Sequence, residues 1–255
     1  MALCCKTVKL VALCYVDGEV GCQPHGAAAW CKPAENERLC METVKLRTTR
    51  GTEFVGHVAV PAEGARGALV VLHEAFGVTP HMKRVCKDYA DQGYAVIAPA
   101  MLSLALGKPE GAVLPQTKNG LDEARRLIEA TDPEDLLGLV QACVDWGRAQ
   151  GLKVATVGFC WGGSVSYKAA SLLENIDACV CYYGGQIHEL CKVAQPKCAT
   201  LVHLAELDRY IPIEAATANL AAFDTAAKVH VYEADHGFNR DDGVTYDPGA
   251  ALVAR

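Results

Sequence analysis

A cysteine stands at a point where an apolar strand is expected to turn sharply into a helix. The segment from Val154 to Gly163 reads VATVGFCWGG, and its GxCxGG turn carries Cys160. This pattern is typical of a nucleophile elbow with cysteine in place of serine, because glycines two residues before and after the nucleophile remove side chains that would clash in the turn. A thiolate held at such a corner could attack a carbonyl carbon.

The turn has two other interpretations. A glycine-rich turn after a strand can hold a phosphate at a helix N-terminus, but this spacing fits neither the dinucleotide fingerprint nor the phosphate loop. Cys160 could also be a structural thiol, since free cysteine is among the most buried residue types. We favour the elbow because partners for a nucleophile occur further along the chain.

An acid and a histidine follow the elbow in the order that such partners have in α/β hydrolases. Asp208 and His236 each come directly after a predicted strand. Nucleophile, acid and histidine occur in this order in that fold, each in a loop after a strand. The sequence therefore predicts a triad of Cys160, Asp208 and His236.

Each partner has an alternative. Asp208 could be a solvated loop acid, and its neighbour Glu206 or the later Asp235 could be mistaken for it. His236 could be a surface histidine before a turn glycine. The ordered occurrence of all three groups at strand ends favours the triad.

Glu74 is a fourth candidate, because it follows the wholly apolar run Ala68–Leu72 by two residues. A carboxylate there is costly to bury unless another group pairs with it. The alternative is an exposed loop residue. Since strand ends beside an elbow line the site, we expect Glu74 to belong to it.

The elements that must position these groups alternate along the chain, which predicts a mostly parallel sheet flanked by helices. Ligands of such sheets bind beyond the carboxyl ends of the strands. A hairpin adds an antiparallel N-terminal edge. The predicted strands are Val44–Arg47, Phe54–Val60, Ala68–His73, Tyr94–Ala98, Val154–Phe159, Ala178–Tyr183, Ala199–Ala205 and Val229–Tyr232, and the predicted helices are Pro80–Gln92, Pro133–Gly151, Ser164–Leu173 and Ile213–Ala226.

Composition narrows the class of protein. The chain has 255 residues, of which 51% are hydrophobic, and a net charge of -6, which argues against nucleic acid as a partner. Its 13 cysteines are odd in number and contain no CxxC pair, so reduced thiols in the cytoplasm are expected rather than disulfides or a zinc ribbon. No signal peptide is recognisable, and no apolar run approaches the roughly 20 residues of a membrane span.

Two segments are expected. Residues 1–43 form a cysteine-rich N-terminal extension whose role the sequence does not reveal, and residues 44–255 form an α/β-hydrolase domain. Asp247 and Pro248 would begin a C-terminal helix that is short, since the sequence stops at Arg255.

Four motifs make the chain resemble the dienelactone hydrolase family, whose members are also called carboxymethylenebutenolidases. The resemblance begins near Val44 and implies an α/β-hydrolase fold. We expect neither a metal nor an organic cofactor, and either a monomer or a weak homodimer. The motifs are LHEAFGV at Leu72–Val78, GFCWGG at Gly158–Gly163, ELDRYIP at Glu206–Pro212 and EADHGF at Glu233–Phe238.

The resemblance also implies roles for particular residues. Cys160 matches the nucleophile, His236 the base and Asp208 the acid that orients the imidazole. Glu74 matches a carboxylate that contacts the thiol when substrate enters. The oxyanion hole is expected from the backbone N–H groups of Ala75 and Trp161.

Three further residues are predicted to bind substrate. Arg240 matches an arginine that pairs with the glutamate at rest and with a substrate carboxylate when one is bound, although a solvated loop arginine is the alternative. Phe76 and Phe238 lie in the motifs beside the predicted catalytic residues.

One departure bears on the substrate. After the strand that ends at Pro99 the family has an acidic residue and then a second carboxylate-binding arginine, whereas this chain reads AMLSLALGK up to Lys108. Lys108 presents a point charge and cannot reproduce a bidentate guanidinium. The sequence predicts hydrolysis of enol lactones such as dienelactone or related activated esters, with a broader carboxylesterase acting on neutral esters as the alternative.

Functions of two other classes remain as alternatives. The N-terminal cysteines could serve a thiol-based redox or metal-handling protein, and Cys179 and Cys181 share one face of a strand, where core packing is the commoner role. A catalytically silent binding domain is the other alternative, which the complete triad argues against.

Overall fold

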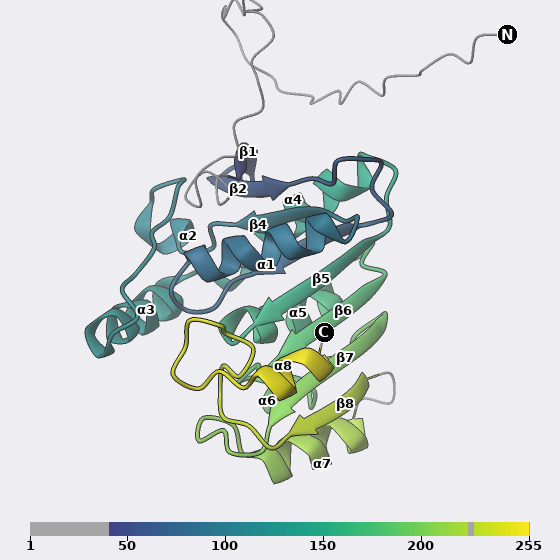
Figure 1. Cartoon of the computed structure of the whole chain (residues 1–255). Coiled ribbons are helices and arrows are strands. Elements are labelled where there is room, and N and C mark those ends of the chain that lie inside the picture. Colours follow the sequence, from purple (N-terminus) through teal and green to yellow (C-terminus); the bar gives the residue numbers. More distant parts are fainter. Residues whose placement is uncertain (1–40, 224–226, 255) are drawn as a thin grey trace, which may run out of the picture.

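The computed structural model describes residues 41–223 and 227–254 as an eight-stranded sheet with helices on both faces (Figure 1). The strand order is β1-β2-β4-β3-β5-β6-β7-β8. The cysteine-rich segment up to residue 40 lies outside the described residues, as does the part of the predicted helix from 224 to 226.

The middle of the sheet is apolar on both faces. Every residue of β3 (Ala68–Leu72) and β4 (Ala95–Pro99) is buried, which explains why these strands read as continuous apolar runs rather than alternating ones. They pair in parallel with each other, and β3 pairs in parallel with β5 (Val154–Phe159). Such a core holds the strand ends in fixed relative positions.

The antiparallel edge is confirmed. β1 (Glu42–Arg47) pairs with β2 (Glu53–Ala59), and β2 in turn runs antiparallel to β4. The other half of the sheet continues in parallel through β6 (Ala178–Tyr182), β7 (Ala199–Ala205) and β8 (Ala227–Tyr232). The strand assignments from the sequence therefore agree with the structure to within two residues at every end.

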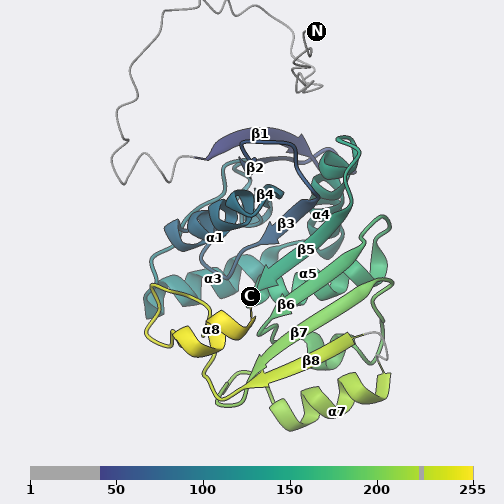
Figure 2. The same cartoon turned by 45° about the vertical axis from the view of Figure 1, so that its right-hand side comes forward.

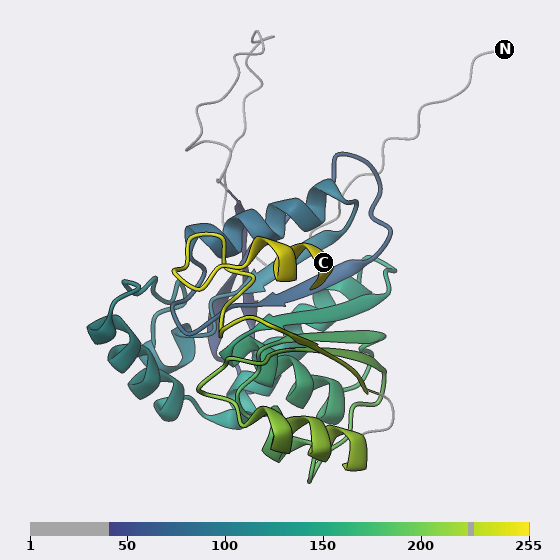
Figure 3. The ribbon, with the colours of Figure 1, turned by 60° about the horizontal axis from the view of Figure 1, so that its bottom comes forward.

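The helices cover the two faces of the sheet. Figure 3 shows α1 (Pro80–Asp91) and α8 (Pro248–Ala254) on one side and α5 (Trp161–Leu172) and α7 (Ile213–Phe223) on the other. The short C-terminal helix α8 is anchored by a hydrogen bond from Tyr182 Oη to the carbonyl oxygen of Ala254. No helix in the described part of the chain is long and apolar enough to cross a membrane.

Capping residues set the helix starts. The Thr79 hydroxyl accepts a hydrogen bond from the Met82 amide at the start of α1, which has Pro80 in its first turn. Asp132 plays the same part for α4 (Pro133–Arg148), accepting from two amides of the first turn. Both helices begin at the prolines that start the two predicted helices.

Three helices are not predicted by the sequence. Two are single turns, α2 (Ser103–Leu106) and α6 (Ile187–Leu190). The third, α3 (Lys118–Ala130), is long and lies beyond the carboxyl ends of the strands (Figure 2). Its apolar residues Leu121, Ala124 and Ile128 recur at helical spacing, but only Gly120 and Ala124 of this helix are fully buried.

Candidate active site

Cys160 occupies a strained corner between β5 and α5. Its φ of 53° and ψ of -116° lie in a region that residues with a side chain rarely adopt. A Cβ at Gly158 would overlap the carbonyl oxygen of Gly162, and a Cβ at Gly162 would overlap that of Leu72. The two glycines are therefore required for the strand to turn this sharply, and the turn exposes the Cys160 thiol at the strand end.

Cys160, His236 and Asp208 lie in one hydrogen-bonded line. His236 Nε2 is 3.2 Å from Cys160 Sγ, and its Nδ1 is 2.6 Å from Asp208 Oδ2. The Asp208 carboxylate is fully buried, and its other oxygen accepts a hydrogen bond from the Tyr210 amide at 2.8 Å. This is the geometry that a nucleophile, a base and an orienting acid need.

The charge on His236 follows from these contacts. Burial by itself lowers the pKa of an imidazole, but the hydrogen bonds to Asp208 and Cys160 oppose burial and raise the pKa of His236 to about 10. The ring is thus an imidazolium at neutral pH. His236 therefore places a positive charge 3.2 Å from Cys160 Sγ.

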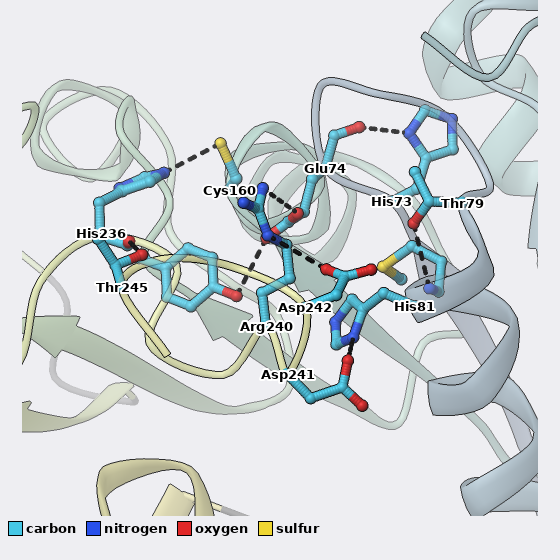
Figure 4. A network of polar contacts seen from close by, with 12 residues as sticks. His73, Glu74, Thr79, His81, Cys160, His236, Arg240, Asp241, Asp242 and Thr245 are labelled. Atoms are coloured by element: carbon cyan, nitrogen blue, oxygen red, sulfur yellow. Dashed lines mark hydrogen bonds and ion pairs between the residues drawn. The ribbon is translucent and has the colours of Figure 1, made fainter. Parts of the chain in front are cut away.

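Glu74 lies close to the thiol but is bonded to other groups. Its Oε1 accepts a hydrogen bond from Tyr183 Oη at 3.2 Å, and its Oε2 is 3.6 Å from an Nη atom of Arg240. Figure 4 shows the Cys160 thiol pointing toward His236 while the Glu74 carboxylate faces Arg240. No hydrogen bond joins Glu74 to Cys160 among the described residues.

Tyr183 is a site residue that the sequence analysis missed. It follows β6 directly, has a φ of 38°, and its ring centroid lies 5.1 Å from that of His236. Burial, together with the negative charge of Glu74, raises the pKa of its phenol well above the usual value. The phenol is therefore a permanent donor to Glu74, and its position at a strand end is the signal that could have identified it.

His73 holds the turn that carries Ala75. Its Nδ1 donates to the Glu74 carbonyl oxygen at 2.5 Å, and its Nε2 accepts from the Met101 amide at 3.1 Å. Complete burial lowers the pKa of His73 to about 4, so the ring is neutral with its proton on Nδ1. The sequence analysis assigned His73 to a strand and gave it no role.

Ala75 and Trp161, whose backbone N–H groups are predicted to form an oxyanion hole, both lie at the strand-end edge of the sheet. Trp161 is the first residue of α5, where a helix has no internal partner for its N–H groups. In the described part of the chain, neither amide is used by a turn or loop hydrogen bond. Both residues line the cavity above Cys160.

A cavity of about 370 Å³ lies above these groups. It is bounded by strand-end loops, by the start of α5 and by one face of α3. The residues that line it are Glu74, Ala75, Phe76, Leu121, Arg125, Ile128, Cys160, Trp161, Ser164, Gly185, Gln186, Arg209, Tyr210, Asp235, His236, Gly237, Arg240 and Thr245.

The sequence of the chain matches the dienelactone hydrolase family over residues 54–254. The chain belongs to the dienelactone hydrolase family. It is 30% identical to a carboxymethylenebutenolidase from Pseudomonas putida over 223 residues, which covers 85% of this chain and 93% of that protein. A carboxymethylenebutenolidase from Pseudomonas sp. strain P51 is 27% identical over 225 residues, covering 85% and 92%.

Solved structures confirm the α/β-hydrolase fold predicted for this dienelactone hydrolase family member. A dienelactone hydrolase-like promiscuous phosphotriesterase, P91, from metagenomic libraries superposes with a TM-score of 0.66 at 23% identity, covering 84% of this chain and 94% of that one. The Pyrococcus furiosus esterase Pf2001 gives a TM-score of 0.60 at 15% identity, covering 91% and 96%. The chain is therefore a hydrolase in family and in fold.

The structure separates the two phenylalanines that the dienelactone hydrolase motifs suggested as substrate contacts. Phe76 lines the cavity, and the Arg240 guanidinium lies 5.9 Å from its ring centroid. Phe238 is wholly buried and packs against Tyr183 and Tyr232 with ring centroids 5.4 and 5.1 Å away. The prediction for Phe238 is wrong, because the backbone turns at Gly237, with a φ of 79°, and directs the ring into the core.

The cavity of this dienelactone hydrolase relative holds more cations than the sequence analysis identified. Arg240, which is predicted to bind substrate, lines it, while Lys108 is not among the lining residues. Arg125 of α3 and Arg209, which follows the triad acid, line it as well. Three arginines therefore line the cavity, and one of them, Arg240, already forms an ion pair with Glu74.

The described cysteines other than Cys160 do not form a second thiol site open to solvent. Cys179 and Cys181 are buried in β6, with their Sγ atoms 3.4 Å apart, and Ser166 Oγ lies 3.2 Å from Cys179 Sγ. Burial raises the pKa of Cys86 to about 12. These thiols pack the core, as expected for strand cysteines two residues apart.

Proposed function

We propose that this chain hydrolyses enol lactones, or esters with a comparably stable leaving group, that carry a carboxylate, and that it does so through a thioester on Cys160. The observation that carries the proposal is the 3.2 Å contact between Cys160 Sγ and the imidazolium of His236 at the base of a cavity lined by arginines. The Pseudomonas relatives named carboxymethylenebutenolidases support the substrate class.

The first half of the reaction opens the ring. The Cys160 thiolate attacks the carbonyl carbon, and the amides of Ala75 and Trp161 bind the oxygen as it becomes negative. The bond from this carbon to the ring oxygen then breaks, and the enolate that leaves takes a proton from His236. The products of this half are a thioester on Cys160 and a neutral imidazole.

The second half releases the acid. His236, oriented by Asp208, removes a proton from a water molecule as the water attacks the thioester carbonyl. Collapse of this intermediate breaks the carbon–sulfur bond and returns the thiolate. The thiolate then takes back the proton that Glu74 accepted from it, and His236 is again an imidazolium, which restores the resting site for the next substrate.

The thiol nucleophile restricts the substrate. A thiolate is a good leaving group, so the first tetrahedral intermediate reverts unless the leaving group of the substrate is comparably stable. A stabilised enolate or phenolate meets this condition, whereas an amide nitrogen does not. We therefore expect lactone or activated ester hydrolysis and negligible peptidase activity.

Glu74 and Arg240 connect substrate binding to the thiol. At rest they pair with each other at 3.6 Å. A substrate carboxylate that takes Arg240 as its partner leaves the Glu74 carboxylate free to approach the Cys160 thiol and accept its proton. A bound anion would then promote formation of the nucleophile that attacks it.

Replacement of Cys160 tests the proposal. Cys160→Ala should lower kcat for an enol lactone or an activated phenyl ester by about 10⁴-fold or more, because the remaining groups cannot form a thioester. Wild type mixed with substrate and quenched in acid should show a mass increase equal to the acyl group, and Cys160→Ala should not. Cys198→Ala is the matched control, since this partly buried thiol does not line the cavity.

Near wild-type turnover by Cys160→Ala would exclude the mechanism.

A paired substrate panel, with each ester made both with a carboxylate and as its neutral methyl ester, addresses the substrate class. A preference for the carboxylated members supports the proposal, whereas equal rates favour a broader carboxylesterase, for which the apolar side chains of Leu121 and Ile128 in the cavity wall are suited.

A further inference from the structure

The loop after His236 presents Arg240 to the cavity from a tight turn. The Gly243 amide donates to the Arg240 carbonyl oxygen at 2.9 Å, which closes the turn from residue 240 to 243. The side chain of Arg240 points inward to Glu74, and its neighbours Asp241 and Asp242 face α1 (Figure 4). The turn therefore has one residue in the site and two against the neighbouring helix.

Asp241 is held by two residues of α1. Arg84 donates to both carboxylate oxygens, from Nε at 3.1 Å and from Nη2 at 2.5 Å, and His81 Nδ1 lies 2.8 Å from Oδ1. Burial alone would raise the pKa of Asp241, but the hydrogen bonds from Arg84 and His81 lower it to about 2. The bidentate contact fixes the direction of the carboxylate as well as its position.

Asp242 links the same arginine to Arg240. One of its oxygens lies 3.5 Å from Arg84 Nη2, and the other lies 3.5 Å from Arg240 Nε. Gly243 completes the arrangement, because a Cβ there would come within 2.7 Å of Arg240 Nε. The side chain of Arg240 therefore packs over Gly243 of its own turn, with its Nε beside Asp242 and its Nη1 beside Glu74.

The cluster is an ion-pair network rather than a cation site. His81, Asp241 and Asp242 offer ligand atoms within 4.8 Å of one another. However, the Arg84 guanidinium already binds both carboxylates, so a metal ion would have to displace a fixed positive charge.

We propose that Arg84 is a positioning residue for substrate selection: through Asp241 and Asp242 it fixes the turn from which Arg240 binds the substrate carboxylate. This inference rests on the proposed function, in which Arg240 binds that carboxylate. Arg84 contacts neither Cys160 nor His236 among the described residues, so its loss should change binding of the anion and not the reaction at the thiol.

Kinetics with paired substrates test the inference. One substrate is a carboxylated activated ester and the other is its neutral methyl ester. Arg84→Met should raise KM for the carboxylated ester about tenfold, with kcat and KM for the neutral ester within twofold of wild type, because coupled contacts of this kind contribute on the order of 1 kcal/mol. Arg84→Lys should restore part of the loss, since a lysine keeps the charge but not the bidentate contact.

A double-mutant cycle with Arg240→Met identifies the route of the effect. If Arg84 acts through Arg240, adding Arg84→Met to Arg240→Met should change KM for the carboxylated ester by less than twofold. Lys87→Met is the matched control, because Lys87 lies on the same helix and pairs with Asp91 at 3.4 Å instead of with the loop. It should leave both substrates unaffected.

The remaining outcomes are decisive. Equal changes for the two esters, or no change for either, would overturn the positioning role of Arg84. Full additivity in the double variant would overturn it as well. If Arg240→Met itself leaves the preference intact, the anchor in the proposed function is wrong, a result distinct from failure of Arg84 alone.

Discussion

The two sides of the cavity are held in place by different means. Cys160, Asp208 and His236 each follow a parallel strand, and hydrogen bonds of 3.2 and 2.6 Å join them around a fully buried carboxylate. Arg240 instead projects from a loop and is held by ion pairs of 3.5 and 3.6 Å. We call the first group the reacting side and the second the anchor side.

This difference predicts that substitutions on one side affect turnover and that substitutions on the other affect the binding of anions. Strand ends in a close-packed sheet move little, so the reacting side is fixed by the core of the protein. The ion pairs of Arg84 with Asp241 and Asp242 are partly exposed and each contribute modest free energy, so they can be altered without loss of the fold, whereas the pair of Arg240 with Glu74 is largely buried. Substitutions on the reacting side should abolish turnover, and those on the anchor side should alter KM for anions.

Asp208→Asn gives the largest expected effect in this comparison. It should lower kcat by about 10³- to 10⁴-fold for carboxylated and neutral esters alike, because the imidazole loses the partner that orients it. Glu206→Gln is the matched control, since this neighbouring acid is exposed. A loss confined to carboxylated substrates would contradict the division into two sides.

The pH profile of the same variant adds a second measurement. The pKa of His236 is raised in the folded protein to about 10. The imidazolium therefore contributes its full stabilisation of the fold below the unfolded pKa of about 6.5, and this contribution is lost as pH rises through 10. Because the imidazolium also protonates the leaving enolate, kcat should decline over the same alkaline range. Asp208 is one of the groups that raise it, so the alkaline decline of kcat should move to lower pH in Asp208→Asn.

Glu74→Gln tests the residue between the two sides. We expect about a 10²-fold lower kcat for carboxylated esters, because an amide cannot accept the thiol proton, and a shift of the acidic limb of the pH profile. Neutral esters, which leave the pairing of Glu74 with Arg240 undisturbed, should lose less. An unchanged pH profile would assign Glu74 to the anchor side alone.

Arg125→Gln has the smallest expected effect. KM for the carboxylated ester should rise two- to fivefold, with kcat unchanged, because a half-exposed arginine on α3 contributes little to binding an anion. Arg126→Gln is the matched control: it lies next along the helix, pairs with Glu123 and does not line the cavity. Equal effects of the two variants would exclude a contribution of Arg125 to the anchor side.

The same division explains what could be predicted from the sequence. The reacting side is encoded in short motifs after strands, so Cys160, Asp208 and His236 were found in order and the structure brings them together. The contact of Arg84 with Asp241 joins residues 157 positions apart, and no local pattern indicates it. The motifs therefore indicate Arg240 but not the ion pairs of Arg84 with Asp241 and Asp242 that hold its turn in place.

Other misses have physical reasons of the same kind. The helix α3 does not follow a strand directly, so motifs at strand ends do not indicate it, although its Leu121, Arg125 and Ile128 line the cavity. Phe238 was assigned to the cavity because it lies two residues after His236, but the turn between them reverses its direction. Tyr183 and His73 act through hydrogen bonds that only the packed strand ends create.

The backbone conformation of Cys160 has a consequence for how this protein can evolve. A residue with a side chain at a φ of 53° and a ψ of -116° costs on the order of 1–3 kcal/mol relative to a relaxed backbone. A glycine at position 160 would relieve much of this strain and remove the nucleophile. Selection for thermal tolerance alone therefore favours loss of the thiol, and only continued demand for turnover keeps the less stable sequence in a population.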